Sequence, residues 1–438
     1  MPDPDIRPNR LDKAEIDKNF ADLHPPLSRS EALIEADRCY FCYDAPCTTA
    51  CPTGIDIPSF IQKIRSDNIR GSAHTILSEN IMGGMCARVC PTEVLCEEAC
   101  VRNSHEDKPV EIGLLQRYAT DPIFEDGTRL FERAAASGRR VAVVGGGPAG
   151  LSCAHRLAML GHEVKIFNRD PRRGGLNEYG IAAYKTVDNF AQREVDWILS
   201  IGGVEVEDGV ELGTDFSLTA LRDAYDAVFL GIGLTLVNDL NIDNEDLPGV
   251  ENATDYIAEL RQAEDKSTLP VGRNVVVIGG GMTAIDIAVQ SKRLGAEKVD
   301  LVYRRGAEDM SASEFEQHLA QVSGVSVHHW LHPKALHGDD HVSSIEFDKN
   351  GQSITMEADV VFKAIGQRLA DQQLASELQG IDIEYGKIVV AGDQATTLPG
   401  VWAGGDCVAG GEDLTVSAVQ HGKVAAHAID RYFGGDNG

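Results

Sequence analysis

The chain has 438 residues, enough for about three domains of ordinary size. A hydrophobic share of 43% and a charged share of 25% are typical of a globular protein. The formal net charge of -28 disfavours nucleic acid or an anionic membrane surface as a partner. No apolar run reaches about 18 residues, so no membrane span is predicted. Met1–Arg10 contains no apolar secretion signal, and we therefore expect a cytoplasmic protein.

Two helices are predicted before the first cysteine, over Lys13–Phe20 and Ser30–Asp37. Eight of the ten cysteines then follow, in a region where glycine and proline predict short helices and loops. They form two groups of four: Cys39-x2-Cys42-x4-Cys47-x3-Cys51-Pro and Cys86-x3-Cys90-Pro-x4-Cys96-x3-Cys100.

The cysteine spacing indicates metal binding. Thiolates are soft ligands, and short spacings bring several sulfurs around one centre. The Cys-x3-Cys-Pro ending resembles the run in bacterial ferredoxins, whose last cysteine ligates the other cluster of a pair. The pattern predicts two iron–sulfur centres and transfer of single electrons. Structural zinc uses similar spacings and stays an alternative, whereas a disulfide framework would need an oxidising compartment.

After the cysteines the chain changes character. A helix over Glu111–Ala119 and a charged connector over Glu125–Arg140 are predicted, and strands then alternate with helices. The first strand, Arg140–Val144, leads into the turn Gly145-x-Gly147-x-x-Gly150 and the predicted helix Leu151–Leu160. Glycines let the backbone approach a pyrophosphate at the helix N-terminus, so this turn predicts a dinucleotide site.

The strand after this helix, Glu163–Phe167, ends at Asn168. An acid usually stands at this position and holds the ribose hydroxyls of the dinucleotide. Asparagine is uncharged but can still form hydrogen bonds. We therefore keep Asn168 as a predicted contact.

A second turn of the same kind is Gly279-x-Gly281-x-x-Ala284, between the predicted strand Asn274–Ile278 and the predicted helix Ala284–Leu294. The next strand, Lys298–Val302, leads into Arg304 and Arg305 instead of an acid. Paired guanidinium groups suit a 2′-phosphate and favour NADP over NAD. Arginines that only face solvent or pair with nearby carboxylates are the alternative.

The C-terminal segment indicates that the first dinucleotide is FAD. Gly405 and Asp406 follow the strand-like Gly400–Ala403 and precede a predicted helix over Thr415–His427. An aspartate here can hydrogen-bond the ribityl or phosphate region of a flavin. Two apolar segments that end in glycine, Leu230–Gly233 and Ala364–Gly366, are expected where the chain passes between the two dinucleotide domains.

The other two cysteines and a group of histidines yield further predictions. Cys153 and Cys407 are single, so a dithiol reductase, which needs two neighbouring cysteines, is disfavoured. Cys153 is predicted to be a buried core residue. The histidines around Trp330 are interpreted as a solvated turn and not as a metal site: His328, His329, His332 and His337.

Several long motifs resemble one known family. The chain is similar to the N-terminal half of dihydropyrimidine dehydrogenase and to its bacterial NAD(P)H-oxidising small subunit; the glutamate synthase small subunit shares the plan. The motifs are Cys39-Tyr-Phe-Cys42-Tyr-Asp-Ala-Pro-Cys47, Cys51-Pro-Thr-Gly-Ile-Asp-Ile-Pro58, Met85-Cys-Ala-Arg-Val-Cys-Pro-Thr92 and Gly281-Met-Thr-Ala-Ile-Asp286.

The resemblance implies a multidomain fold, in which an N-terminal α-helical domain with two iron–sulfur clusters precedes two interleaved Rossmann-like α/β dinucleotide-binding domains. The expected limits are 1–135 for the cluster domain, 136–242 and 366–438 for the FAD domain, and 243–365 for the NAD(P) domain.

The resemblance also sorts the cluster ligands. It implies that one [4Fe–4S] cluster is held by Cys39, Cys42, Cys47 and Cys100, and the other by Cys51, Cys90, Cys96 and Gln116. Since cysteine is a softer ligand for iron than an amide, Cys86 stays an alternative to Gln116.

Further expected contacts come from the glycine turns and the resemblance together. Those expected at FAD are Gly145, Gly147, Ala149, Gly150, Asn168, Gly175, Leu176, Gly405, Asp406 and Thr415. Those expected at NAD(P)H are Gly279, Gly281, Thr283, Ala284, Arg304, Arg305 and Gly366. Because some family members with a similar arginine pair use NADH, the choice between NADH and NADPH stays open.

The function implied is electron transfer. NAD(P)H would give a hydride to FAD, and the clusters would pass electrons on singly, without a catalytic acid or base from this chain. The family carries its pyrimidine-reducing FMN site on a barrel for which the sequence after the flavin region has no room. We therefore expect a hetero-oligomer with an FMN-containing subunit that has its own iron–sulfur clusters and reduces uracil or thymine to 5,6-dihydropyrimidines. The alternative is the glutamate synthase small subunit, and a zinc-stabilised binding protein is the alternative outside the enzymes.

Overall fold

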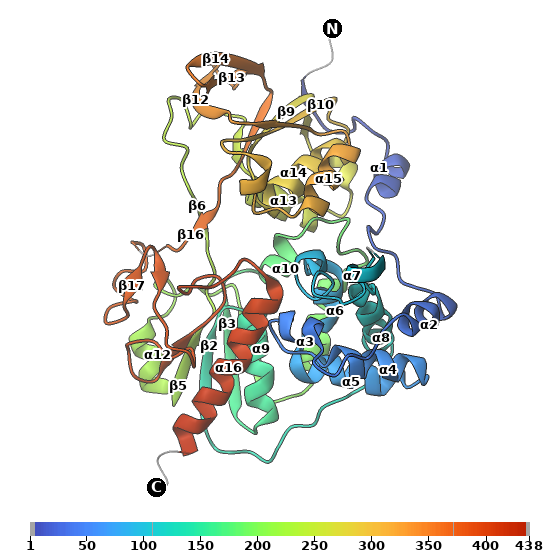
Figure 1. Ribbon diagram of the computed structural model, residues 1–438. Helices are drawn as coiled ribbons and strands as arrows, with labels where there is room; N and C mark the ends of the chain where they lie inside the picture. The colour runs from blue at the N-terminus through green and yellow to red at the C-terminus, as the bar shows by residue number, and fades with distance from the viewer. Residues whose placement is uncertain (1–4, 107, 371, 435–438) are drawn as a thin grey trace. The chain divides into compact units, whose positions relative to one another are not determined.

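The computed structural model describes residues 5–106, 108–370 and 372–434 (Figure 1). The chain forms two compact units, each assembled from separate stretches. The first unit contains the chain up to Leu23, Tyr179–Val187 and Leu236–Gln367. The second unit contains His24–Glu178, Asp188–Thr235 and the chain from Arg368 onward. The chain therefore passes repeatedly from one unit to the other.

The cysteine-bearing part of the second unit is helical. Polar caps define where its helices begin: Ser28 and Glu31 form a capping box, and Asp56 and Asn68 accept from the first turns of their helices. Apolar side chains from these helices form one buried core that also includes Cys96. The elements are α2 (Arg29–Asp37), α3 (Pro46–Ala50), α4 (Ile57–Arg65), α5 (Ile69–Glu79), α6 (Gly83–Val89), η1 (Thr92–Val94), α7 (Asn103–Glu106) and α8 (Ile112–Asp126).

The rest of the second unit is built on a five-stranded parallel sheet in the order β19-β5-β2-β3-β4. Its strands β19, β5 and β2 are largely apolar runs such as Ala227–Leu230, as expected where both faces of a sheet are covered, whereas the edge strand β4 alternates valine with acidic residues. Figure 1 shows α9 and α16 side by side near this sheet. The elements are β2 (Arg140–Val144), α9 (Pro148–Met159), β3 (Glu163–Asn168), α10 (Leu176–Tyr179), α11 (Phe190–Leu199), β4 (Val204–Asp208), α12 (Leu218–Ala224), β5 (Ala227–Leu230), β17 (Ile383–Glu384), β18 (Lys387–Ile388), β19 (Val401–Ala403) and α16 (Thr415–Gly434).

The first unit has its own five-stranded parallel sheet, in the order β11-β10-β9-β15-β7. A three-stranded antiparallel sheet, β12-β13-β14, is inserted before β15. The elements are β1 (Ile6–Arg7), α1 (Lys13–Asn19), β7 (Val250–Asn252), α13 (Ala253–Gln262), η2 (Lys266–Thr268), β8 (Val271–Gly272), β9 (Asn274–Gly279), α14 (Met282–Arg293), β10 (Lys298–Tyr303), η3 (Ala307–Asp309), α15 (Glu314–Val322), β11 (Ser326–His329), β12 (His332–His337), β13 (Ser344–Lys349), β14 (Gln352–Glu357) and β15 (Val360–Ala364). The short strands β6 (Leu236–Val237) and β16 (Gln367–Arg368) pair where the chain crosses between units.

The predicted fold class is confirmed: a helical cysteine-bearing part precedes two parallel α/β sheets. Most predicted elements are also found, with shifted ends. The helix predicted to end at Ala119 continues to Asp126, so the connector begins only at Gly127, whose positive φ of 68° ends the helix. The C-terminal helix continues to Gly434 and not to His427.

The interpretation of the histidine group was wrong about its backbone. His328 and His329 belong to β11, and His332 and His337 belong to β12. Only Trp330, with a φ of 65°, and Leu331 lie between the two strands. Carboxylates also face two of these rings, since Asp300 lies 2.8 Å from His328 and Glu346 lies 3.4 Å from His337. The prediction of a buried Cys153 is confirmed.

All ten cysteines are free thiols. Among the helices of the described part of the chain, none combines the length and the apolar character that crossing a bilayer requires.

Candidate cofactor sites

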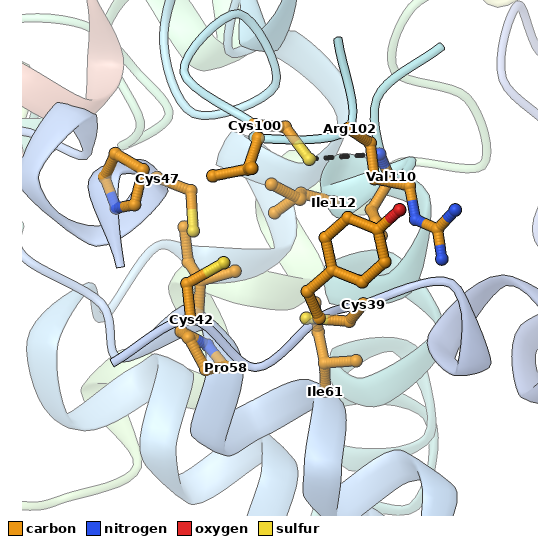
Figure 2. Close-up of a pocket in the computed structure, with 13 residues that line it drawn as sticks. Cys39, Cys42, Cys47, Pro58, Ile61, Cys100, Arg102, Val110 and Ile112 are labelled. Carbon is orange, nitrogen blue, oxygen red and sulfur yellow. Dashed lines mark hydrogen bonds between the residues drawn. The ribbon is translucent and has the colours of Figure 1, made fainter. Parts of the chain in front are cut away.

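Four cysteines from different elements line one cavity, which we call the Cys39 pocket (Figure 2). Cys39 and Cys42 lie on the loop after α2, Cys47 lies in α3, and Cys100 precedes α7. Apolar side chains of α4 and α8 complete the wall. Two backbone amides point at sulfur, with Phe41 N 3.4 Å from Cys39 Sγ and Val110 N 3.5 Å from Cys100 Sγ.

The remaining clustered cysteines line a second cavity, which we call the Cys90 pocket. Its lining includes Cys51, Cys86, Cys90, Cys96 and Gln116. Both candidates for the fourth ligand, Cys86 and Gln116, therefore lie at the same cavity. One apolar residue of α16, Val416, also contributes to its wall, so this pocket adjoins the last helix of the sheet-containing part of the second unit.

Gln116 is held in a defined orientation. Its side-chain Nε2 donates to the carbonyl oxygen of Gly83 over 2.7 Å, and the side chain is buried. Within the described residues no hydrogen bond to its Oε1 is found, so that oxygen stays available as a ligand atom. Cys86 lies within hydrogen-bonding reach of Cys90, which raises the pKa of Cys90 together with burial.

The donor set fits an iron–sulfur group. Burial, followed by the charge of Cys39, raises the pKa of Cys47 to about 12, and burial also raises the pKa of Cys39 and Cys96. These thiols therefore lose their protons readily only when a cationic centre stands among them. In the described residues no three His, Cys, Asp or Glu side chains converge tightly enough to hold a single metal ion; the sulfurs surround cavities instead.

The first glycine turn of the second unit has the backbone that a pyrophosphate site needs. Gly147 caps α9, and Pro148 occupies its first position. A Cβ on Gly150 would collide with the carbonyl oxygen of Gly145, so only glycine allows this close approach. Gly175 lies against Gly147, which places the segment before α10 beside the turn. The N-terminus of α9 can therefore receive an anion.

The side chain of Asn168, at the end of β3, is hydrogen-bonded to neighbouring residues of this chain. Its Oδ1 accepts from Gly146 N over 3.2 Å, and its Nδ2 donates to Asp170 O over 2.6 Å and to Asp208 Oδ1 over 3.1 Å. The side chain thus stabilises the turn and its flanking loop. A direct contact to the ribose stays a prediction.

The predicted C-terminal contacts also gather near this turn. Gly405 has a φ of 99° and donates from its backbone N–H to His421, which lies on α16. Burial and the neighbouring Asp413 raise the pKa of Asp406 to about 6. Thr415 donates to Asn177 over 2.6 Å, next to Leu176 on α10. These residues come from distant parts of the sequence and belong to one unit.

The predicted nicotinamide contacts lie in the first unit. Gly281 caps α14, which contains Thr283 and Ala284, and a Cβ on Gly279 would collide with the carbonyl oxygen of Ala364. Arg304 and Arg305 are exposed at the end of β10. Arg305 lies over the ring of Tyr303 at 5.5 Å. Gly366 follows β15 with a φ of 89°.

Sequence reasoning missed the residues that support these sites. Lys423 of α16 bonds to Thr53, Glu194 of α11 accepts from the start of α6, and Lys185 lies between two buried carboxylates. Each of these contacts joins residues about 100 or more positions apart, so no local pattern could have revealed them.

Two family descriptions match the chain. Residues 16–128 match the 4Fe-4S cluster domain II of dihydropyrimidine dehydrogenase, and residues 139–422 match the pyridine nucleotide-disulphide oxidoreductases. The NAD-dependent dihydropyrimidine dehydrogenase subunit PreT of Escherichia coli K12 is 34% identical over 95% of this chain and 98% of its own length. The glutamate synthase [NADPH] small chain of the same strain is 33% identical over 98% and 96%.

Solved structures share the fold. The thioredoxin reductase of T. acidophilum aligns with a TM-score of 0.54 and 22% identity over 66% of this chain and 98% of its own. FprA from Mycobacterium tuberculosis in complex with NADPH aligns with a TM-score of 0.56 and 17% identity over 68% and 85%. At these identities the likeness concerns the fold alone.

Proposed function

Because the chain belongs to the family of NAD-dependent dihydropyrimidine dehydrogenase subunits, we propose that it is the electron-input subunit of such an enzyme. It would oxidise NAD(P)H and supply electrons to a separate FMN-containing subunit, which has its own iron–sulfur clusters and reduces uracil or thymine. The cofactors would be FAD and two [4Fe–4S] clusters. Iron ligation needs free thiolates, which supports a cytoplasmic location.

The observation that carries this proposal is the division of the cysteines. The four that the family resemblance assigns to one cluster line the Cys39 pocket, and the four ligands assigned to the other line the Cys90 pocket. Residues that are far apart in the sequence, such as Cys47 and Cys100, meet at the same cavity. The spacing of the cysteines along the sequence does not by itself predict these two sets of ligands.

The chain's own residues would then hold the cofactors and exclude water. FAD would supply hydride acceptance and release of single electrons, and the clusters would supply one-electron transfer. The N-terminus of α9 would bind the pyrophosphate, and Asp406 would hydrogen-bond the flavin side of the dinucleotide. Buried side chains would keep solvent from the metal, Ile57 and Ile112 at the Cys39 pocket and Ile55 and Ile57 at the Cys90 pocket.

Two features support an order of electron flow toward the Cys39 pocket. Val416 of α16 lines the Cys90 pocket, whereas every residue lining the Cys39 pocket comes from the helical cysteine-bearing part. We assign the Cys90 pocket to the flavin side and the Cys39 pocket to the exit side. Tyr43, next to Cys42, is fully exposed and offers a contact for the partner.

The test uses the full chain purified under nitrogen. It should contain flavin, iron and sulfide, lose its flavin absorbance on titration with NADH or NADPH, and reduce an artificial dye. It should not reduce uracil until an FMN-containing partner is added. Uracil reduction by this chain alone, or a colourless protein that contains zinc, would contradict the proposal.

The glutamate synthase small chain is the second candidate, because relatives with that name are 33% identical over nearly the full length. Its electron input would be the same and its partner would be an amidotransferase subunit. Affinity purification from the native cell separates the two, since the partner retained is either of the pyrimidine-reducing type or much larger.

A further inference from the structure

The side-chain hydroxyl of Thr53, two residues after Cys51, lies within hydrogen-bonding distance of the Cys51 sulfur. Its Oγ1 lies 3.3 Å from Cys51 Sγ, and the residue is 3% exposed. A sulfur bound to iron carries no proton, so the threonine hydroxyl must then be the donor. In the Cys39 pocket the backbone amides of Phe41 and Val110 donate to sulfur, whereas in the Cys90 pocket a side-chain hydroxyl lies at this distance.

Lys423 holds the same residue from the other side. Its Nζ donates to the carbonyl oxygen of Thr53 over 2.9 Å and to Glu79 Oε2 over 2.8 Å. The lysine side chain is 13% exposed and Glu79 is 46% exposed, so solvent screens the carboxylate more than the ammonium group. A positive charge on α16 is therefore held directly behind the loop that contains Cys51.

Such contacts act on a redox centre in a known direction. Reduction adds one electron to the cluster and neither forms nor breaks a bond to the protein. A hydrogen bond to a ligating sulfur and a nearby cation both stabilise the added negative charge, and so raise the reduction potential. The effect is large where low polarity weakens screening.

We propose that Thr53 and Lys423 are positioning residues that raise the reduction potential of the cluster in the Cys90 pocket, so that it accepts electrons from the flavin side. This inference rests on the proposed function, because it requires a cluster in the Cys90 pocket with Cys51 as one of its ligands. Thr53 acts through the Cys51 sulfur, and Lys423 acts through its charge and by fixing the Thr53 loop.

The experiment is a redox titration of the full, anaerobically reconstituted chain, followed by electron paramagnetic resonance. The signal lost in Cys96→Ala identifies the Cys90 pocket, because Cys96 lines this pocket alone. In Thr53→Val that signal should shift to lower potential, with the reduced-to-oxidised ratio at a fixed potential falling up to about tenfold, or about 59 mV for one electron. Thr53→Ser keeps the hydroxyl and should match the wild type.

A matched control is Ser72→Ala. Ser72 is fully buried in the same helical part, and its hydroxyl donates to the carbonyl oxygen of Phe60 over 2.9 Å and not to sulfur. This variant should leave both cluster potentials unchanged, which separates a loss of packing from a loss of the donor to sulfur.

Charge is tested in both directions. Lys423→Met removes the cation and should lower the same potential, whereas Glu79→Gln removes its counter-charge and should raise it. A role in packing alone would not reverse the sign between these two variants. The signal of the Cys39 pocket should stay unchanged in both.

The outcomes separate the two claims. A wild-type chain without clusters would refute the proposed function. A wild-type chain with both clusters, and variants with unshifted potentials, would refute only this inference. If Thr53→Val fails to retain its cluster, Lys423→Met decides: a lowered potential supports the inference, and an unchanged potential or a lost cluster overturns it.

Discussion

At the scale of single residues, the fourth ligand of the Cys90 pocket is the sharpest question. Gln116 and Cys86 both line the cavity, but they are held differently. Gly83 fixes the amide nitrogen of Gln116 and leaves its oxygen available, whereas Cys86 lies against the neighbouring thiol of Cys90.

We predict that Gln116→Ala removes one of the two clusters, because it deletes the oriented oxygen ligand. Cys86→Ser should keep both, since it changes a neighbour and not a ligand. Iron and acid-labile sulfide per flavin measure the result. If Cys86→Ser halves the iron content and Gln116→Ala does not, the assignment is reversed.

Our second prediction is that the two arginines after β10 determine the preference for NADPH over NADH. Arg304 and Arg305 are exposed, and two guanidinium groups suit a 2′-phosphate. Replacing both by glutamine should lower kcat/KM for NADPH by about tenfold to a hundredfold, a loss of about 1.4–3 kcal/mol in charge-assisted hydrogen bonds. The value for NADH should change little. An unchanged NADPH-to-NADH ratio in dye reduction would show that the pair only faces solvent.

At the scale of elements, the start of α6 depends on a carboxyl group from α11. Glu194 is fully buried, and its Oε1 accepts from Gly84 N over 2.9 Å and Met85 N over 3.0 Å. Its other oxygen has no hydrogen-bond partner in the described structure. Burial raises the pKa of Glu194 to about 8, although the two amides and Arg88 oppose this shift.

The third prediction is that Glu194→Gln becomes more stable than the wild type as the pH rises. Between the ordinary pKa of 4.5 and about 8, the unfolded wild type releases a proton that the folded state keeps, so its stability falls with rising pH. Glutamine still accepts from both amides and carries no such dependence. Melting temperatures at pH 5 and pH 8 should diverge by the equivalent of a few kcal/mol. A difference that does not depend on pH would show that Glu194 stays ionised.

The position of the segment Tyr179–Val187 is also determined by tertiary packing. The segment begins at the last residue of α10 and ends before α11, but it belongs to the first unit. There Lys185 Nζ lies 2.7 Å from both Asp286 of α14 and Glu316 of α15. Burial lowers the pKa of Lys185, but the two carboxylates outweigh it and the net pKa is raised.

We predict that Lys185→Met destabilises the protein by about 3–5 kcal/mol, because it removes the ammonium group that lies between two buried carboxylates. Denaturant unfolding gives the magnitude, and hydrogen exchange should rise in Tyr179–Val187. Lys13→Met breaks an exposed pair with Asp17 and serves as the control. Equal stability of the two variants would mean that the ion pairs of Lys185 with Asp286 and Glu316 contribute little to the free energy of unfolding.

At the scale of the whole molecule, different parts of the chain form different cofactor sites. The lining of the Cys39 pocket contains no residue of the two parallel sheets or their helices. Our fifth prediction is that Cys42→Ser removes the exit cluster and leaves the flavin reaction intact. Stopped-flow bleaching of the flavin by NAD(P)H should keep its rate, while electron delivery to the partner subunit should fall at least tenfold. Slower bleaching would show that the two parts depend on each other.

Much of this organisation follows from local pattern. Strand, glycine turn and helix lie adjacent in the sequence, so both dinucleotide folds were predictable around Gly147 and Gly281. Helix ends were less predictable. The continuation of α8 past Ala119 depends on burial of Ile123 and Phe124, which the charged residues beside them conceal in the sequence.

By itself, the sequence determined the types of site: thiolates at short spacing bind a soft metal, and glycine at a helix start admits a phosphate, because both depend on residues a few positions apart. Only the tertiary structure decided which cysteines share a cavity, that Gln116 and Cys86 face the same one, and that Lys423 lies behind Cys51. Those relations depend on packing between residues up to several hundred positions apart, and no local pattern encodes them.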